Sequence, residues 1–244
     1  SVSIVELYPE TLSLNGDVGN RTALAYRARL AGLDVVESSY RVGDDVPASD
    51  VDVILIGSGT SSAVHQIAPD LERIAPWIRE RVAAGAVLVA AGAGFSLMTR
   101  SVRFAPDDVL TGVGIFDADT DASAARTITE GFAFDSEFGL IVGTENHTTT
   151  VTRDATQAPF GSVRYGKGNG DQAEGAISGN AIGTHCHGPL LPMNPVLTDA
   201  LLTRIAEANG ESYRPGAAHH DIDAVTAQTR AILLTKSGIA DASL

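Results

Sequence analysis

Two short, almost continuously apolar segments, Val51–Gly57 and Ala86–Gly92, constrain the fold of this chain more than any other feature. Strands with one face in water alternate apolar and polar residues, whereas strands buried on both faces do not. The two segments therefore predict inner strands of a parallel sheet that is covered on both sides. Two further strands are expected at Ser3–Pro9 and Leu33–Tyr40.

Amphipathic helices are predicted between these strands. The clearest spans Ser62–Ala84, where apolar residues recur every three or four positions and Gly85 follows as a stop. A second spans residues 19–33, with Gly32 as its C-terminal stop. Strand and helix in alternation predict right-handed crossovers. The expected fold class is therefore α/β, a three-layer α/β/α sandwich with a mostly parallel central sheet.

The pattern of the sequence changes at about Gly112, where short β-like pieces follow one another with many turns. Such pieces predict antiparallel additions to the sheet and long surface loops. Helices are expected again after Pro195 and over residues 221–236. A chain of 244 residues is consistent with one large α/β domain, and we expect a single domain over residues 1–244.

The charge balance limits the classes of partner. The formal net charge is −13, from 17 Lys and Arg against 30 Asp and Glu, so neither nucleic acid nor an anionic membrane is expected to bind. No apolar run approaches the roughly 20 residues that span a bilayer, and we expect no membrane insertion. The single cysteine, Cys186, cannot form an internal disulfide, and the first residues lack a signal-peptide pattern. A cytoplasmic location is therefore expected.

Ligands of α/β sheets bind beyond the C-terminal ends of the strands, where three segments of this chain are expected to meet. The first is Ile56–Ser62, in which Gly57 and Gly59 allow backbone N–H groups to turn toward a developing anion. An ordinary glycine turn, capped by Ser61 or Ser62, explains the same residues equally well.

The second segment is the strand, turn and helix start at residues 85–101. Small residues at Ala90, Gly92 and Gly94 match the spacing around a nucleophile on a sharp elbow. The apex itself is Gly92, which has no side chain to attack a carbonyl. Ser96 lies one turn into the helix and is interpreted as an ordinary polar helix residue.

The third segment is Gly183–Pro195, with two histidines flanking the cysteine. In an extended segment His185 and His187 project from one face while Cys186 projects from the other. One imidazole is a candidate general base. The pair is also a candidate metal site together with His219 and His220, but no spaced carboxylate or second cysteine completes it, and we expect no metal. Cys186 is expected to be a small buried side chain.

Taken in order, these motifs resemble the class I glutamine amidotransferase domain, most closely its GatD and CobB/CobQ-like branch. The resemblance rests on LNGDVGNRTAL, DVILIGSG, GVGIFDADT, ARTITE, GTENHTTT, YGKGNG and GTHCHGPLLPMNP. The last segment is the most specific. The resemblance reaches about Ala208, which leaves residues 209–244 as a C-terminal helical extension.

The resemblance implies a particular chemistry. In active members an elbow cysteine attacks the side-chain amide of glutamine, forms a thioester and releases ammonia to a partner synthetase, without a cofactor. In the GatD branch that partner is a Mur-ligase-like synthetase of the MurT type, which amidates the peptidoglycan precursor lipid II. The positions that the resemblance assigns are His187 for the catalytic histidine, Gly57 and Gly59 for the oxyanion region, Arg126 for the glutamine carboxylate, Glu145, Asn146 and His185 for the surrounding substrate site, and Gly92 for the cysteine.

Three hypotheses follow from the glycine at position 92. The favoured one is a glutamine amidotransferase-like protein that binds glutamine or a related small ligand and a synthetase but does not hydrolyse. In the second, His187, His185, Arg126 and Glu145 form an acid-base or hydrolytic site without a covalent step. In the third, an active glutaminase had its nucleophile replaced by design. Ser96 stands where a glutamine commonly follows the elbow, and one engineered change does not explain two departures.

Overall fold

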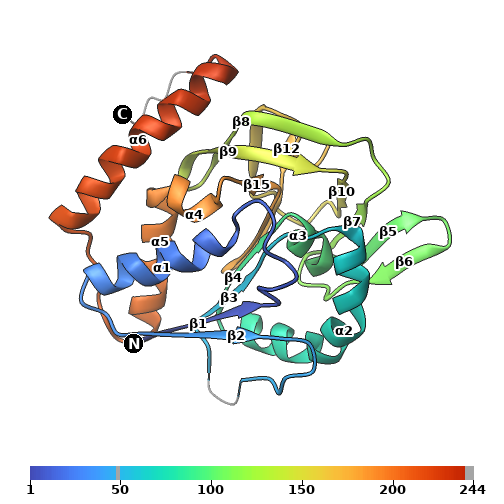
Figure 1. Ribbon diagram of the computed structural model, residues 1–244, viewed down its shortest axis with the longest axis horizontal. Helices are drawn as coiled ribbons and strands as arrows, with labels where there is room; N and C mark the ends of the chain where they lie inside the picture. The colour runs from blue at the N-terminus through green and yellow to red at the C-terminus, as the bar shows by residue number, and fades with distance from the viewer. Residues whose placement is uncertain (48–49, 240–244) are drawn as a thin grey trace.

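The computed structural model describes residues 1–47 and 50–239. Its centre is a six-stranded sheet with the order β13-β14-β4-β3-β1-β2 (Figure 1). Its strands are β1 (Val2–Leu7), β2 (Val35–Tyr40), β3 (Val53–Ile56), β4 (Val87–Ala91), β13 (Ala176–Ser178) and β14 (Ala181–Thr184). Every neighbouring pair is parallel except β13 and β14. The strands predicted for the first half of the chain coincide with β1 to β4.

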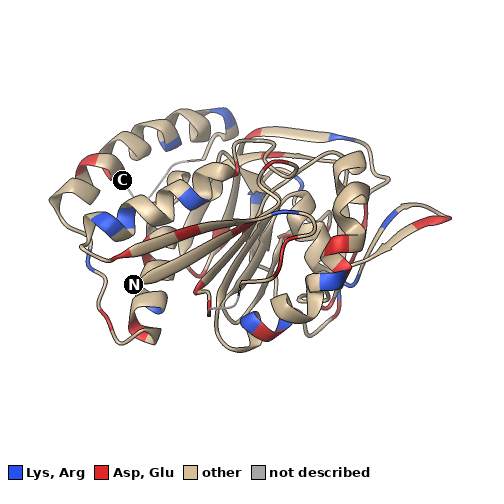
Figure 2. Cartoon of the chain, turned by 60° about the horizontal axis from the view of Figure 1, so that its bottom comes forward, with Lys and Arg blue, Asp and Glu red and all other residues tan. Residues whose placement is uncertain are grey.

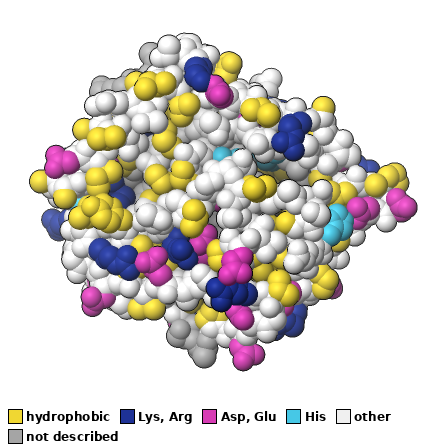
Figure 3. All heavy atoms as spheres, in the orientation of Figure 1, with side chains coloured by type: hydrophobic (Ala, Val, Ile, Leu, Met, Phe, Trp, Pro, Cys, Tyr) yellow, Lys and Arg dark blue, Asp and Glu magenta, His cyan; other side chains and the backbone are white. Residues whose placement is uncertain are grey.

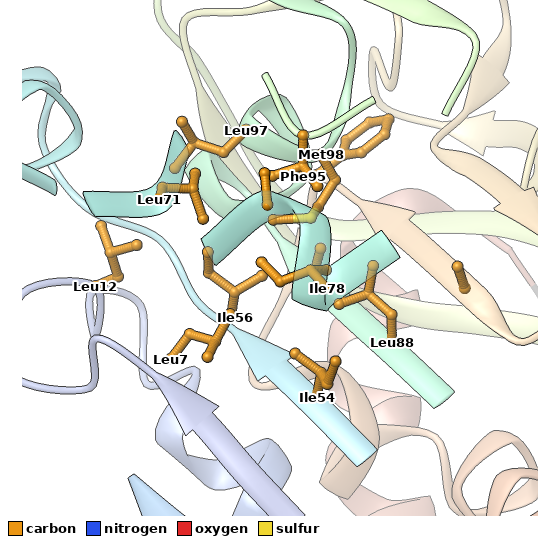
Figure 4. Packing of buried hydrophobic residues seen from close by; sticks show 14 of the residues in the cluster. Leu7, Leu12, Ile54, Ile56, Leu71, Ile78, Leu88, Phe95, Leu97 and Met98 are labelled. Carbon is orange, nitrogen blue, oxygen red and sulfur yellow. The ribbon is translucent and has the colours of Figure 1, made fainter. Parts of the chain in front are cut away.

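Alternate residues of the inner strands pack into separate cores on the two faces of this sheet. On β3, Ile54 and Ile56 belong to one core, and Val53 and Leu55 belong to the other. The helices that cover the two faces are α2 (Ser61–Ala83) and α3 (Ala93–Met98) on the first, and α1 (Val18–Leu30) and α5 (Pro195–Ala208) on the second. Figure 4 shows the first core, where side chains of α2 and α3 meet those of β3 and β4. The α/β/α expectation is confirmed.

Helix α2 begins one residue earlier than predicted, and a different side chain caps it. The Thr60 hydroxyl accepts a hydrogen bond from the Ala63 N–H at 3.2 Å. Ser61 is already the first helical residue, so the expectation that Ser61 or Ser62 caps the turn is wrong. A threonine in extended conformation before the first turn supplies an acceptor for an N–H group that has no partner within the helix.

The strands after β4 mostly form two further sheets and start earlier than the sequence indicated. Every pair in these sheets is antiparallel except β5 with β7. One sheet has the order β10-β7-β5-β6 and the other β12-β11-β8-β9-β15. Their strands are β5 (Ser101–Ala105), β6 (Asp108–Thr111), β7 (Ala118–Asp121), β8 (Thr127–Ser136), β9 (Gly139–His147), β10 (Thr150–Arg153), β11 (Gly161–Tyr165), β12 (Ala173–Glu174) and β15 (Cys186–His187). Among the described residues, only β13 is an antiparallel addition to the central sheet. The β5–β6 hairpin projects from the body of the molecule (Figure 1).

The C-terminal part of the chain is helical, with α4 (Leu190–Met193) before α5 and α6 (Ala217–Ser237) after it. Helix α6 lies along the outer side of β8 and near α1 and α4 (Figure 1). Arg27 of α1 links α6 to the rest of the molecule. Its guanidinium forms ion pairs with Asp199 of α5 at 2.7 Å and with Asp223 of α6 at 2.6 Å.

Charged residues of both signs are spread along the helices and strands (Figure 2). On the face in Figure 3, charged side chains are interspersed with apolar and neutral polar ones. On that face the acidic side chains are therefore distributed rather than gathered in one patch. Among the described residues, no helix combines the length and apolar character that crossing a membrane requires.

Candidate functional site

A cavity of about 310 Å³ opens where the loops after β1, β3 and β4 meet the β8–β9 region. Its wall is rich in hydroxyl groups and amides, with one guanidinium and one imidazole. The polar lining residues are Asn15, Ser58, Thr60, Ser61, Ser96, Arg126, Asn146, His147, Thr148 and Thr149. The Ser96 hydroxyl is buried and has no hydrogen-bond partner among the described residues. The cavity can hold a small polar molecule.

Gly92 lies in this cavity wall, at the turn between β4 and α3. Its φ of 57° and ψ of −117° are strained for any residue with a side chain and unstrained for glycine. A Cβ atom at this position would lie 2.8 Å from Cε1 of His187 and 2.5 Å from the Ser58 hydroxyl. The turn therefore has the shape of a nucleophile elbow, and its apex points at His187.

His187 is held by a carboxylate that the sequence did not single out. Its Nδ1 lies 2.8 Å from Oδ1 of Asp17, the residue before the first turn of α1, and both side chains are buried. A carboxylate only accepts, so Nδ1 carries a proton in this hydrogen bond. Nε2 has no hydrogen-bond partner among residues 1–47 and 50–239. The hydrogen bond to Asp17 therefore fixes the orientation of the imidazole, with Nε2 as its unpartnered nitrogen.

The second oxygen of Asp17 fixes the loop after β3. Its Oδ2 accepts the Ser58 N–H at 2.9 Å, and the Ser58 hydroxyl accepts the Ala93 N–H at 3.1 Å. Position 57 has no room for a side chain, because a Cβ atom there would lie 2.5 Å from the Leu12 carbonyl oxygen and 3.0 Å from Cβ of Asp17. Gly59 lines the cavity beside it. The Ser58 N–H, which lies between the two glycines of the expected oxyanion region, is therefore already bound to Asp17.

A buried chain of polar side chains forms the base of the cavity on the β9 side. His147 lies 3.0 Å from Glu145 through Nε2 and 3.0 Å from the Thr149 hydroxyl through Nδ1. The Thr149 hydroxyl is also hydrogen-bonded to Nε2 of His185, and Nδ1 of His185 is hydrogen-bonded to Oε2 of Glu174, each at 3.0 Å. The two imidazoles stack with their centroids 4.1 Å apart. Burial, reinforced by the positive form of His185, lowers the pKa of His147.

Glu145 is completely buried, and its carboxylate is the acceptor of several hydrogen bonds. Beyond His147, its oxygens accept hydrogen bonds from the Thr129 hydroxyl and from the N–H groups of Lys167 and Gly168. Burial alone raises the pKa of a carboxyl, but these donors outweigh it and the pKa of Glu145 is lowered. Glu145 thereby fastens the loop of Lys167 and Gly168 to strand β9.

Arg126 and Asn146 form the rim of the cavity. Nη1 of Arg126 donates to Oδ1 of Asn146 at 3.3 Å, and Nδ2 of Asn146 reaches Oδ1 of Asn15 at 3.4 Å. Arg126 is exposed, so its guanidinium can turn toward a carboxylate that enters the cavity. The rim therefore offers a charged anchor at some distance from the buried histidine.

The structure brings some of the expected site residues together and separates others. Gly59, Gly92, Arg126 and Asn146 line the cavity, and His187 lies directly behind Gly92. His185 and Glu145 are buried in the network behind the wall. The four groups of the acid-base hypothesis thus do not converge on one cavity.

Asp17 and Ser58 were missed by sequence reasoning. Asp17 stands in the LNGDVGN motif, and a carboxylate before a helix at the ligand-binding edge of the sheet is the signal that could have identified it.

The two histidines of the GTHCHG segment bind different partners, because the chain bends at His185 between β14 and β15. His219 lies elsewhere, with Nε2 donating to the Arg27 carbonyl oxygen at 2.9 Å. Within the part of the chain that the structure describes, no three His, Cys, Asp or Glu side chains are arranged to hold a metal.

Cys186 is expected to resist alkylation in the folded protein. It is completely buried, and burial raises the pKa of its thiol well above the ordinary range, so the reactive thiolate is scarce. Mass spectrometry after brief exposure to iodoacetamide should find no modified Cys186 under native conditions and full modification in denaturant. Rapid native labelling would contradict the buried position.

Comparison with known proteins gives the family. A model of the CobB/CobQ-like glutamine amidotransferase domain matches residues 4–195. The chain belongs to this family. Among curated relatives, a protein of Staphylococcus aureus (strain N315) described as lipid II isoglutaminyl synthase (glutamine-hydrolyzing) subunit GatD is 29% identical over 217 residues, covering 88% of each chain. The GatD subunit of Streptococcus pneumoniae (strain ATCC BAA-255 / R6) is 28% identical over 206 residues, covering 83% of this chain and 79% of the relative.

Solved structures agree on the fold. A glutamine amidotransferase crystal structure aligns with a TM-score of 0.53 at 15% identity, covering 84% of this chain and 99% of the other. A glutamine amidotransferase from Thermotoga maritima aligns with a TM-score of 0.53 at 11% identity, covering 95% and 93%. Both likenesses support the class I glutamine amidotransferase-like architecture.

Proposed function

We propose that this chain is a non-hydrolysing member of its family, a glutamine amidotransferase-like subunit that binds glutamine or a related amino acid but does not release ammonia from it. Gly92 takes the position of the nucleophilic cysteine in this proposal, and His187 is the retained histidine. The observation that carries the proposal is that a Cβ atom at position 92 would lie 2.8 Å from Cε1 of His187. Position 92 faces His187, and the residue there has no side chain.

No second thiol replaces the missing one. Cys186 is the single cysteine of the sequence, and its sulfur packs beside Gly143 and lies 3.7 Å from the carbonyl oxygen of His187. The thiol is buried and its pKa is raised, which opposes nucleophilic attack. Loss of the nucleophile in a comparable catalytic group costs about 10⁶ in rate.

A glutaminase assay tests the loss of activity. The purified chain, incubated with L-glutamine, is expected to release glutamate and ammonia no faster than a His187→Ala variant, which retains the elbow but lacks the base. Circular dichroism establishes that both proteins are folded. Glutamine turnover at an ordinary enzymatic rate that His187→Ala abolishes would overturn the proposal.

Retention of the amino-acid site predicts measurable binding without turnover. Arg126 is the proposed anchor of the ligand carboxylate, and a hydrogen bond to a charged group is worth about 1.5–3 kcal/mol. Arg126→Ala is therefore expected to weaken L-glutamine binding at least about tenfold in isothermal titration calorimetry. Arg103→Ala is the matched control, because Arg103 is exposed and pairs with Asp121 outside the cavity wall. Equal affinities for all three proteins would argue against this anchor.

The partner in this proposal is a Mur-ligase-like synthetase, and the shared reaction is amidation of a peptidoglycan precursor. The similarity to two subunits described as GatD of lipid II isoglutaminyl synthase supports this class of partner. A Mur-ligase-like synthetase from the same host, purified separately and mixed with this chain, is expected to co-elute in size-exclusion chromatography. Separate elution at micromolar concentrations of both proteins would contradict a stable complex.

A further inference from the structure

Ser58 fills the space that a side chain at position 92 would need. A Cβ atom on Gly92 would lie 2.5 Å from Oγ and 2.8 Å from Cβ of Ser58. Rotation about χ1 moves the hydroxyl but leaves Cβ in place, so a change of rotamer does not remove the second contact. Carbon atoms that are not bonded to each other are at their optimum separation at about 3.5–4.0 Å. The backbone or the loop after β3 must therefore shift before position 92 can carry any side chain.

Movement of that loop is opposed by three buried contacts. The Ser58 N–H donates to Asp17, and the Asp17 carboxylate also holds His187. The Gly94 N–H donates to the carbonyl oxygen of Gly57 at 3.1 Å, which joins the start of α3 to the same loop. A displacement of Ser58 therefore disturbs the support of the imidazole itself.

Ser58 also binds the backbone N–H of Ala93, the first residue after the elbow position. Its hydroxyl accepts the Ala93 N–H at 3.1 Å. In acyl-transfer sites of this shape, the N–H of the residue after the nucleophile is one of the donors for the developing oxyanion. With Ser58 in place, that donor is satisfied by the protein and is not available to a substrate oxygen.

We propose, building on the non-hydrolysing function above, that Ser58 is a second determinant of the inactive site: its side chain takes both the nucleophile's space and the Ala93 donor. Gly92 and Ser58 form a matched pair. A cysteine at position 92 alone therefore cannot restore a working elbow. Glycine at position 58 removes both Ser58 contacts with the new side chain and frees the donor, and only the 2.8 Å approach of the new Cβ to Cε1 of His187 then remains.

A double-mutant cycle that combines substitutions at positions 58 and 92 tests this pairing directly, with the midpoint of thermal unfolding as the measured quantity. In the Gly92 background, Ser58→Gly is expected to lower the unfolding midpoint, because it leaves the part-buried Ala93 N–H without its acceptor. In the Gly92→Ala background, which adds only the Cβ atom, Ser58→Gly is expected to raise the midpoint by relieving the close contact. Ser58→Ala is the matched control. It removes the hydroxyl but retains the Cβ at 2.8 Å, so it should give no such rescue.

Thiol reactivity provides an independent readout in Gly92→Cys. The native alkylation rate of the introduced thiol with iodoacetamide should be at least about tenfold higher in Gly92→Cys/Ser58→Gly than in Gly92→Cys, with buried Cys186 as an internal reference. Glutamine hydrolysis, if gained, should likewise appear only in the double variant.

The outcomes separate this proposal from the proposed function. Glutaminase activity of the unmodified chain would overturn the function and leave the cycle interpretable. The pairing is wrong if Ser58→Gly lowers the midpoint equally in both backgrounds, if single and double cysteine variants react at the same rate, or if glycine at position 58 rescues neither variant at position 92 from misfolding. A change in sign of the Ser58→Gly effect supports it.

Discussion

Replacement of Glu145 with alanine is expected to lower the free energy of unfolding by about 3 kcal/mol or more. The side chain is fully buried and accepts hydrogen bonds from Thr129, His147, Lys167 and Gly168. Its removal leaves two buried donors, on His147 and Gly168, and two part-buried donors, on Thr129 and Lys167, without an acceptor. Each buried unsatisfied group costs about 1–3 kcal/mol. Urea denaturation followed by circular dichroism measures the loss.

Glu130→Ala is the matched control on the neighbouring strand. Glu130 is 62% exposed at its side chain and pairs with Lys236 on the surface, where an ion pair contributes about 0–1 kcal/mol. A loss of stability in Glu145→Ala no larger than in Glu130→Ala would show that the buried network is not required for the fold.

The stabilisation by Glu145 should also depend on pH in a defined direction. Its pKa in the folded protein is lowered from the ordinary value of 4.5, so the ionised form is favoured by folding. This contribution is complete above about pH 4.5 and is lost as the pH falls through the lowered pKa. The difference in unfolding free energy between the unmodified chain and Glu145→Ala should therefore narrow on acidification from pH 5 to pH 3, and a difference that widens would contradict the sign.

The parallel core was predictable because local sequence determines it. The apolar run Val51–Gly57 has no polar face to expose, and the stripe of α2 can be buried only against such a sheet. Residues 101–111 were not assigned to strands because their hairpin is held by pairing with β7 and by contacts such as His65 with Asp108, rather than by an apolar alternation of its own. Pairing of that kind is not visible in a local window.

The candidate site was predictable only where a motif carries it. His187 and Gly92 could be named from the order of segments along the chain, as could Arg126. Asp17 could not, because it meets His187 from 170 residues away and only the closed sheet brings the two together. Ser58 stood in a turn that glycines already explained, and its conflict with a side chain at position 92 is a matter of atomic distances. Spacing along the chain indicates which segments meet, but not which atoms compete for one space.

Replacement of Arg27 with alanine is the second change with a large expected effect, a loss of about 3 kcal/mol. Its guanidinium is 5% exposed and joins Asp199 of α5 to Asp223 of α6, and Tyr213 also donates to Asp199. Removal of one partner of a buried ion pair costs about 3–5 kcal/mol. The lower end applies here because the two carboxylates keep some contact with water. Arg29→Ala is the matched control, since Arg29 is 50% exposed and pairs only at the surface with Glu37.

The shape of the Arg27→Ala unfolding curve tests whether residues 209–244 belong to the same unit as the rest of the chain. The family match ends at residue 195, yet His219 of α6 bonds to the Arg27 carbonyl oxygen, and Leu234 packs beside Ala133 and Val142 of the β8–β9 pair. These contacts lead us to expect that Arg27→Ala unfolds in one transition. Its midpoint should lie at a lower urea concentration than that of the unmodified chain, and the dependence of the unfolding free energy on urea concentration should be unchanged. Release of α6 as a separate early transition, detected as proteolytic cleavage within residues 217–237 while the sheet stays folded, would instead make the C-terminal helix an independent appendage.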